Sequence, residues 1–157
     1  LGKALGASGG YICGSQQLID LLINRARSFI FSTAPVPAAA AAATAGIRFV
    51  QSSAGKNRCD KLWQRVAELN SKLKIKNSKS RSAIIPILIG DENRAVQAAK
   101  DLLTREIFVP AIRYPTVARG AARLRVTLTT AHTGDDVSRL ASALAPIVNQ
   151  KSKIKNA

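Results

Sequence analysis

One lysine near the start of the chain has neighbours that would let it do chemistry. Lys3 is the only charged residue among the first ten, and four of those ten are glycines. A desolvated lysine amine loses its proton more easily than a solvated one and can form an imine with a carbonyl compound. The alternative is a glycine-rich turn with a solvated lysine, which is the commoner meaning of such a sequence. A P-loop is excluded, because alanine follows the lysine and no glycine lies five residues before it.

Two other sets of polar residues could bind anions. Ser32 and Thr33 precede a proline-initiated helix, where hydroxyls can help to hold a phosphate, and simple capping is the alternative. Arg123 and Arg125 are two residues apart in an alternating segment, so we expect both on one face of a strand. A guanidinium on a rigid strand suits a carboxylate, and the alternative is a pair of solvated arginines.

The first fifty residues predict short helices and few strands. Residues 11–13 form an apolar run that we expect to be a strand, and residues 29–31 could also be extended. Ser15 is expected to cap a helix that runs to about residue 27. Pro37 suits the first turn of an alanine-rich helix, which residues 52–55 should end.

The middle of the chain predicts one amphipathic helix and an exposed connector. Apolar residues recur at three- and four-residue steps over residues 59–73, with charges between them. We expect Trp63 to pack in the core. The basic segment that follows, up to Ser82, is predicted to be exposed.

From residue 83 the pattern changes to alternating strands and helices. We expect strands at residues 83–89 and 122–130, with short extended pieces at 108–109 and 111–112 between them. Pro86 implies an edge strand or a bulge. Helices are expected after Asp91, with Leu103 among its inward residues, and after Thr133, whose cap is followed by two aspartates. This half predicts a small α/β domain with helices on one face of a sheet.

Composition limits the possible functions. The chain has 157 residues, 46% of them hydrophobic, and a formal charge of +15. The excess of basic residues lies mainly between residues 48 and 81 and in the tail, where aromatic residues are scarce, so we expect solvated faces and no nucleic-acid site. No run approaches the roughly 18 apolar residues of a membrane span. Cys13 and Cys59 lack the spacing of a metal site or disulfide framework, and we expect buried thiols in the cytoplasm, with no bound metal.

Three segments in this order resemble the motifs of the pyridoxal-phosphate-dependent α-oxoamine synthases. They are LGKALGASGG at residues 1–10, FIFSTAPVP at residues 29–37, and AIRYPTV with GAARLRVTLTTAHT at residues 111–133. The resemblance extends to about residue 148. It implies an α/β fold, namely the C-terminal part of a fold-type I transferase that depends on pyridoxal phosphate. Residues 1–50 would end the large cofactor-binding domain, and residues 51–157 would form the small C-terminal domain with its basic tail.

The resemblance also implies roles for individual residues. Lys3 would bind pyridoxal phosphate covalently and act as the acid and base at the substrate's α-carbon. Thr33, with Ser32 beside it, would reach the cofactor phosphate of the neighbouring subunit, so the active site would be shared in a homodimer. Thr116 would lie against the acyl substrate. Arg125 would bind the amino-acid carboxylate, for which Arg123 is the weaker candidate.

His132 receives no role from the resemblance, and a packed or capping histidine is expected. The reaction implied is condensation of an amino acid with an acyl thioester and loss of carbon dioxide. A relative with other substrates, or a non-catalytic basic binding module, are the alternatives. Because the chain opens inside a glycine-rich loop, we also expect it to be part of a longer protein and inactive as it stands.

Overall fold

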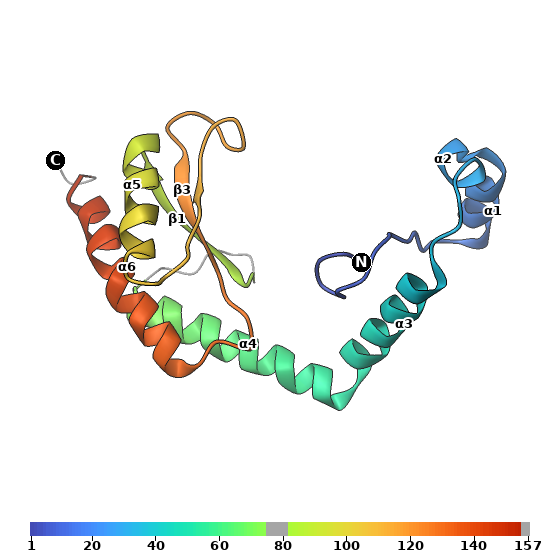
Figure 1. Cartoon of the computed structure of the whole chain (residues 1–157), viewed down its shortest axis with the longest axis horizontal. Coiled ribbons are helices and arrows are strands. Elements are labelled where there is room, and N and C mark those ends of the chain that lie inside the picture. Colours follow the sequence, from blue (N-terminus) through green and yellow to red (C-terminus); the bar gives the residue numbers. More distant parts are fainter. Residues whose placement is uncertain (75–81, 155–157) are drawn as a thin grey trace. The chain divides into compact units, whose positions relative to one another are not determined.

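The computed structural model describes residues 1–74 and 82–154 (Figure 1). The chain divides into two compact units, which we call unit 1, Leu1–Asn57, and unit 2, Arg58–Ala157. Their boundary falls inside the helix α4, Ser53–Lys72. Most of the predicted basic connector and the end of the tail lie outside the described residues.

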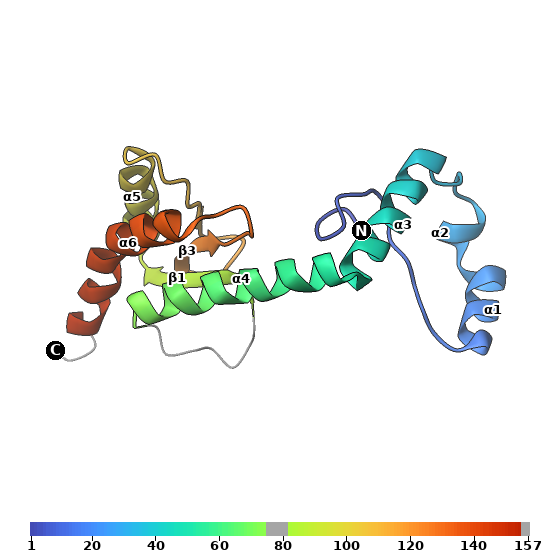
Figure 2. The same cartoon turned by 90° about the horizontal axis from the view of Figure 1, so that it is seen from below.

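Unit 1 is helical. It contains α1, Gln16–Arg25, then α2, Arg27–Ile30, and α3, Pro37–Gln51, which Figure 2 shows from a second side. The Ser15 hydroxyl accepts a hydrogen bond from the Leu18 amide at 3.4 Å, so the predicted cap of α1 is confirmed. Pro37 opens α3, also as predicted, because a helix start does not need the amide hydrogen that proline lacks.

Two predicted extended segments in unit 1 are wrong. Residues 29–31 end the short helix α2, because the Ala26 carbonyl accepts from the amides of both Phe29 and Ile30. Residues 11–13 are irregular and exposed. An isolated strand leaves its backbone hydrogen-bonding groups unpaired, and residues 1–57, all of which are described, contain no partner strand.

A single serine separates α3 from α4. The Ser52 hydroxyl donates to the Phe49 carbonyl at 2.6 Å and accepts from the Gly55 amide at 3.2 Å. It therefore satisfies one backbone group at the end of one helix and one at the start of the next. Gly55 allows the close turn, because a Cβ there would overlap the Phe49 carbonyl. The predicted break at residues 52–55 is confirmed.

Unit 1 buries little apolar surface. Its buried hydrophobic residues are Ala7 and Ala43, both small. Larger apolar side chains are exposed along the whole unit, namely Tyr11, Ile12, Leu18, Leu21, Ile23, Phe29, Ile30, Phe31, Val36, Ile47, Phe49 and Val50. The helices of unit 1 are thus held mainly by local hydrogen bonds and caps.

Unit 2 is built on a three-stranded antiparallel sheet in the order β1-β3-β2. The strands are β1, Ile84–Gly90, then β2, Ala111–Ile112, and β3, Ala122–Thr127. Pro86 lies on the edge strand opposite Arg125, so the first of the two predicted consequences of the proline is confirmed. The register shifts only between Leu88 and Gly90, beyond the proline. An edge position suits proline, which cannot donate to a second neighbouring strand.

The helices α5, Glu92–Leu103, and α6, Gly134–Ile154, cover one face of this sheet (Figure 1). The core combines alternate residues of the strands with the apolar stripes of α4, α5 and α6. Its largest fully buried side chains are Leu69, Leu102, Leu124, Val126, Val137 and Leu144. The other face of β3 carries Arg125 and Thr127, which are exposed as the alternation predicts.

Three predictions about burial are wrong. Leu103 was expected to face inward but is 57% exposed, because it lies one position past the buried Leu102 on α5. Cys13 and Cys59 are both free and exposed. Cys13 belongs to the irregular segment before α1, and Cys59 lies in the exposed first part of α4. Trp63 is only partly buried.

Among the helices within the described ranges, none is both long and apolar enough to cross a membrane.

Candidate functional site

Lys3 lies in a tight loop formed by the first ten residues. The Leu1 nitrogen donates to the Gly9 carbonyl at 3.0 Å and the Leu5 amide donates to the Leu1 carbonyl at 3.2 Å. Gly6 and Gly9 have φ angles of +61° and +94°, which residues with a Cβ rarely adopt. The glycines therefore close the loop, and Lys3 is exposed on it. Within the described residues, its amine has no hydrogen-bond or ion-pair partner.

The loop rests on α3 at one point of close approach. A Cβ at Gly46 would lie 3.1 Å from the Leu5 carbonyl oxygen and 3.3 Å from the Leu5 Cβ. Ala43, one turn earlier on α3, is among the two buried apolar residues of unit 1, and Ala7 in the loop is the other. The small residues of α3 thus let the backbone of the lysine loop lie directly on the helix.

Ser32 and Thr33 are both exposed in the segment between α2 and α3. The Ser32 hydroxyl donates to the Phe29 carbonyl at 3.3 Å, so it caps the end of α2. The N-cap position of α3 is Val36, with no side-chain hydrogen bond to the helix. Neither the Ser32 nor the Thr33 hydroxyl therefore caps α3. The positive end of the 15-residue α3 helix is left without a side-chain acceptor.

The structure distinguishes the two arginines of β3. The Arg123 Nε donates to the Ala121 carbonyl at 3.0 Å, and the side chain is partly buried. Arg125 is exposed, and within the described part of the chain its guanidinium has no hydrogen-bond partner. Its amide donates to the Pro110 carbonyl at 2.9 Å, which fixes the backbone beneath it. All the guanidinium donors of Arg125 are thus available for a ligand, whereas the Nε of Arg123 is engaged. The assignment of the carboxylate to Arg125 stays a prediction.

Arg125 lines an open groove of about 550 Å³ in unit 2. Residues 106–110 form one wall, β3 and the residues after it form another, and the first turns of α6 form the third. Sequence reasoning missed Phe108 and Arg139 as groove residues. Phe108 is 79% exposed, an unusual place for a large aromatic side chain, but only the structure puts it in the same groove as Arg125.

His132, also at the groove, shapes the turn after β3. Its Nδ1 accepts a hydrogen bond from the Thr129 amide at 3.0 Å, so the neutral ring carries its proton on Nε2. The expected capping role is confirmed. Nothing in the sequence indicated that the other ring nitrogen, Nε2, would be left available for a ligand among the described residues.

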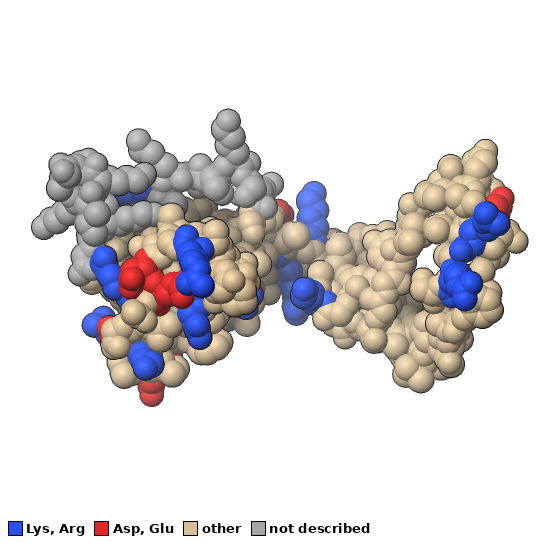
Figure 3. Space-filling model, turned by 90° about the horizontal axis from the view of Figure 1, so that it is seen from above, with Lys and Arg blue, Asp and Glu red and all other residues tan. Residues whose placement is uncertain are grey.

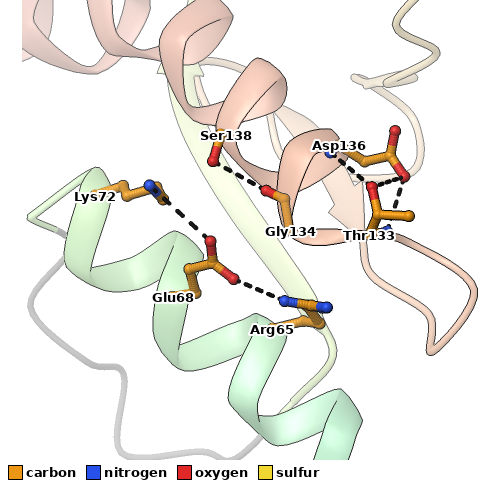
Figure 4. A network of polar contacts seen from close by, with 7 residues as sticks. All are labelled: Arg65, Glu68, Lys72, Thr133, Gly134, Asp136 and Ser138. Carbon is orange, nitrogen blue, oxygen red and sulfur yellow. Dashed lines mark hydrogen bonds and ion pairs between the residues drawn. The ribbon is translucent and has the colours of Figure 1, made fainter.

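The first turn of α6 is fixed by three reciprocal hydrogen bonds between Thr133 and Asp136 (Figure 4). Thr133 donates to the Asp136 carboxylate from its amide and from its hydroxyl, both at 2.8 Å, and the Asp136 amide returns a bond to the Thr133 hydroxyl at 3.1 Å. The two bonds that the Asp136 carboxylate accepts from Thr133 lower the pKa of Asp136. The predicted Thr133 cap is confirmed.

Thr116 lies in the loop between β2 and β3 and does not line the groove. Its amide donates to the Arg113 carbonyl at 2.9 Å, and the side chain is exposed. The structure therefore brings Arg125 and His132 to one groove, with Thr116 in a loop of the same unit. Lys3, Ser32 and Thr33 belong to unit 1 and form a separate set.

Charges in unit 2 are mixed in sign. In the view of Figure 3, the acidic side chains of the folded part at the left lie among Lys and Arg side chains. Within the described ranges, no group of three His, Cys, Asp or Glu residues could hold a metal ion.

Comparison with known proteins places these features in one family. The model of the aminotransferase class I and II family matches residues 1–144. A putative 8-amino-7-oxononanoate synthase of Desulfovibrio desulfuricans is 48% identical over 146 residues, which are 92% of this chain and 38% of that protein. The 8-amino-7-oxononanoate synthase of Bordetella petrii is 40% identical over 96% of this chain and 39% of its own length. The chain thus spans less than half the length of these relatives.

Solved structures share the fold. The 8-amino-7-oxononanoate synthase from Francisella tularensis superposes with a TM-score of 0.77 at 27% identity, over 99% of this chain and 45% of that one. Serine palmitoyltransferase from S. paucimobilis, solved with a bound PLP-myriocin aldimine, gives a TM-score of 0.80 at 21% identity, over 93% and 37%. The fold class expected from the sequence is confirmed.

Proposed function

The chain belongs to the aminotransferase class I and II family, and we propose that it is the C-terminal part of an 8-amino-7-oxononanoate synthase of biotin biosynthesis. The relatives at 40–48% identity that carry this name support the proposal. The reaction we propose is the condensation of L-alanine with a pimeloyl thioester, carried by coenzyme A or acyl carrier protein, with loss of carbon dioxide. The enzyme would work as a cytoplasmic homodimer with shared active sites, and unit 1 would end its large domain.

The residues of this chain fit pyridoxal phosphate. The cofactor needs an accessible amine with room beside it, and Lys3 is exposed on a loop whose neighbours are glycine and alanine. It also needs an anion site, and the α3 N-terminus has no side-chain cap while Ser32 and Thr33 lie just before it. When bound, pyridoxal phosphate would supply an electron sink that lets a proton leave the amino-acid α-carbon.

The roles of the chain's own residues follow from their chemistry. Lys3 would attach the cofactor through its amine and, once free, would move the proton at the substrate's α-carbon, because an amine can do both. Ser32 and Thr33 would hold the phosphate in the partner subunit's site. Arg125 would orient the amino-acid carboxylate through two parallel hydrogen bonds. The observation that carries this assignment is the exposed Lys3 amine on a glycine-closed loop, without a partner among the residues that the structure describes.

The test uses the full-length protein that contains this chain. Borohydride reduction in the presence of pyridoxal phosphate should add the mass of the cofactor to the peptide with Lys3. The Lys3→Ala variant should lose this label and all turnover of L-alanine with pimeloyl thioester. Lys100→Ala, which removes an exposed lysine from α5, is the matched control and should retain both. Label on another lysine would refute the role of Lys3, and turnover only with glycine and a short acyl-CoA would refute the substrates.

A further inference from the structure

The loop that carries Thr116 is closed by two stacked side chains. The guanidinium carbon of Arg119 lies 4.3 Å from the centre of the Tyr114 ring. A cation within about 6 Å of the face of an aromatic ring is attracted by the ring's negative face. The pair therefore joins the two sides of the loop, with Thr116 between them.

Backbone bonds hold this loop only in part. The Thr116 and Val117 amides both donate to the Arg113 carbonyl, at 2.9 and 3.3 Å, and the Ala121 amide donates to the Ala118 carbonyl at 3.0 Å. Residues 113–120 are exposed apart from the partly buried Val117. A segment with few buried apolar contacts opens locally at low cost. The Tyr114–Arg119 stack adds a side-chain contact where burial supplies almost none.

Thr116 itself presents a free hydroxyl. Its amide is engaged by Arg113, but its hydroxyl has no hydrogen-bond partner among the residues that the structure describes. The direction of this hydroxyl therefore depends on the conformation of the loop. Whatever fixes the loop fixes the position of the one polar atom that Thr116 can offer to a ligand.

We propose that Tyr114 and Arg119 are positioning residues for the acyl thioester. This inference rests on the proposed function and on the role that the family resemblance implies for Thr116, which would lie against the acyl substrate. The stack holds the Thr116 hydroxyl in place before the substrate arrives, so that binding does not have to order the loop. Its loss would weaken binding of the acyl substrate and leave the chemistry at the amino acid unchanged.

The experiment compares variants of the full-length protein. Tyr114→Leu and Arg119→Gln should each raise KM for the acyl thioester about threefold to fivefold, as expected for an exposed cation–π contact. We expect kcat to stay within about twofold and KM for the amino acid to stay unchanged. Tyr114→Phe keeps the ring and should behave as the wild type. Arg105→Gln removes the charge of another exposed arginine of unit 2 and is the matched control.

Amide hydrogen exchange at Thr116 and Val117 tests the stack without turnover. Exchange should be faster in Tyr114→Leu than in the wild type and unchanged in Tyr114→Phe. Equal exchange in Tyr114→Leu and the wild type, or equal KM values, would overturn the inference. A wild type that does not turn over L-alanine and pimeloyl thioester would refute the proposed function and the role toward the acyl donor. The exchange rates would then still decide whether the pair holds the loop.

Discussion

Substitution of Gly46 tests whether the lysine loop rests on α3. A Cβ at this position would lie 3.1 Å from the Leu5 carbonyl oxygen, whereas ordinary contacts begin at 3.4 Å, so the loop must move by roughly 0.3 Å. Overpacking costs about 1–3 kcal/mol, and so small a conflict beside a loop belongs at the low end, about 1 kcal/mol. Alanine also favours the helix by about 1 kcal/mol over glycine. The two effects nearly cancel in the free energy of unfolding.

Cofactor binding should not show this cancellation. The gain in helix propensity does not change the position of Lys3, whereas the displacement of the loop does. We therefore expect Gly46→Ala to weaken the affinity for pyridoxal phosphate by about fivefold, which corresponds to about 1 kcal/mol. Gly46→Leu adds a side chain that cannot fit under Leu5 and should weaken it by more than about a hundredfold. Absorbance titration of the full-length protein measures both affinities, and thermal unfolding of the cofactor-free protein measures stability.

Thr44→Ala provides the matched control on the same helix. It also introduces alanine in α3, at an exposed position whose hydroxyl bonds back to the Ala40 carbonyl at 2.9 Å. We expect a small gain in stability and unchanged affinity for the cofactor. If Gly46→Leu binds pyridoxal phosphate as tightly as the wild type, the loop does not depend on α3 and the reasoning fails.

Three further predictions concern unit 2. Thr133→Ala should lower the stability of unit 2 by about 1 kcal/mol through loss of the α6 cap, measured by urea unfolding. Because the folded-state pKa of Asp136 is lowered, its contribution is present above the unfolded pKa of about 3.9 and is lost as pH falls through the folded value. Asp136→Asn should therefore destabilise at pH 6 and differ less from the wild type near pH 3; a difference independent of pH would contradict this. Arg125→Lys should raise KM for the amino acid at least about tenfold, because lysine cannot form the bidentate pair, whereas Arg123→Lys should not. Equal effects at both positions would refute the assignment.

The sequence predicted unit 2 better than unit 1, for a physical reason. The alternation at residues 122–127 and most of the stripes of α4, α5 and α6 match the burial that the structure shows, because one face of each element packs on a common core. Cys59, Trp63 and Leu103 do not match it. In unit 1 the apolar runs at residues 11–13 and 29–31 have no such face, and the same run is compatible with a strand or a helix. Their conformation depends on whether a partner strand exists.

The sequence likewise predicted only part of the candidate site. Motifs pointed to Lys3, Thr33, Thr116 and Arg125, and their roles remain proposals. The sequence could not tell that the Arg123 Nε is engaged by the Ala121 carbonyl, because that bond depends on the local path of the chain. Nor could it show that Phe108 and Arg125 line one groove, since seventeen positions separate them along the chain and only the fold brings them together there.

The scarcity of buried residues in unit 1 has a consequence for residues 1–157 when they are produced by themselves. With Ala7 and Ala43 as its buried apolar residues, unit 1 has little core of its own to stabilise it. Proteases cut where local opening is cheap. In this chain alone, cleavage should therefore begin in the unit that carries Lys3, while the better-packed unit 2 persists as a resistant core. A preparation of the chain would then lose Lys3 before it lost the fold of unit 2.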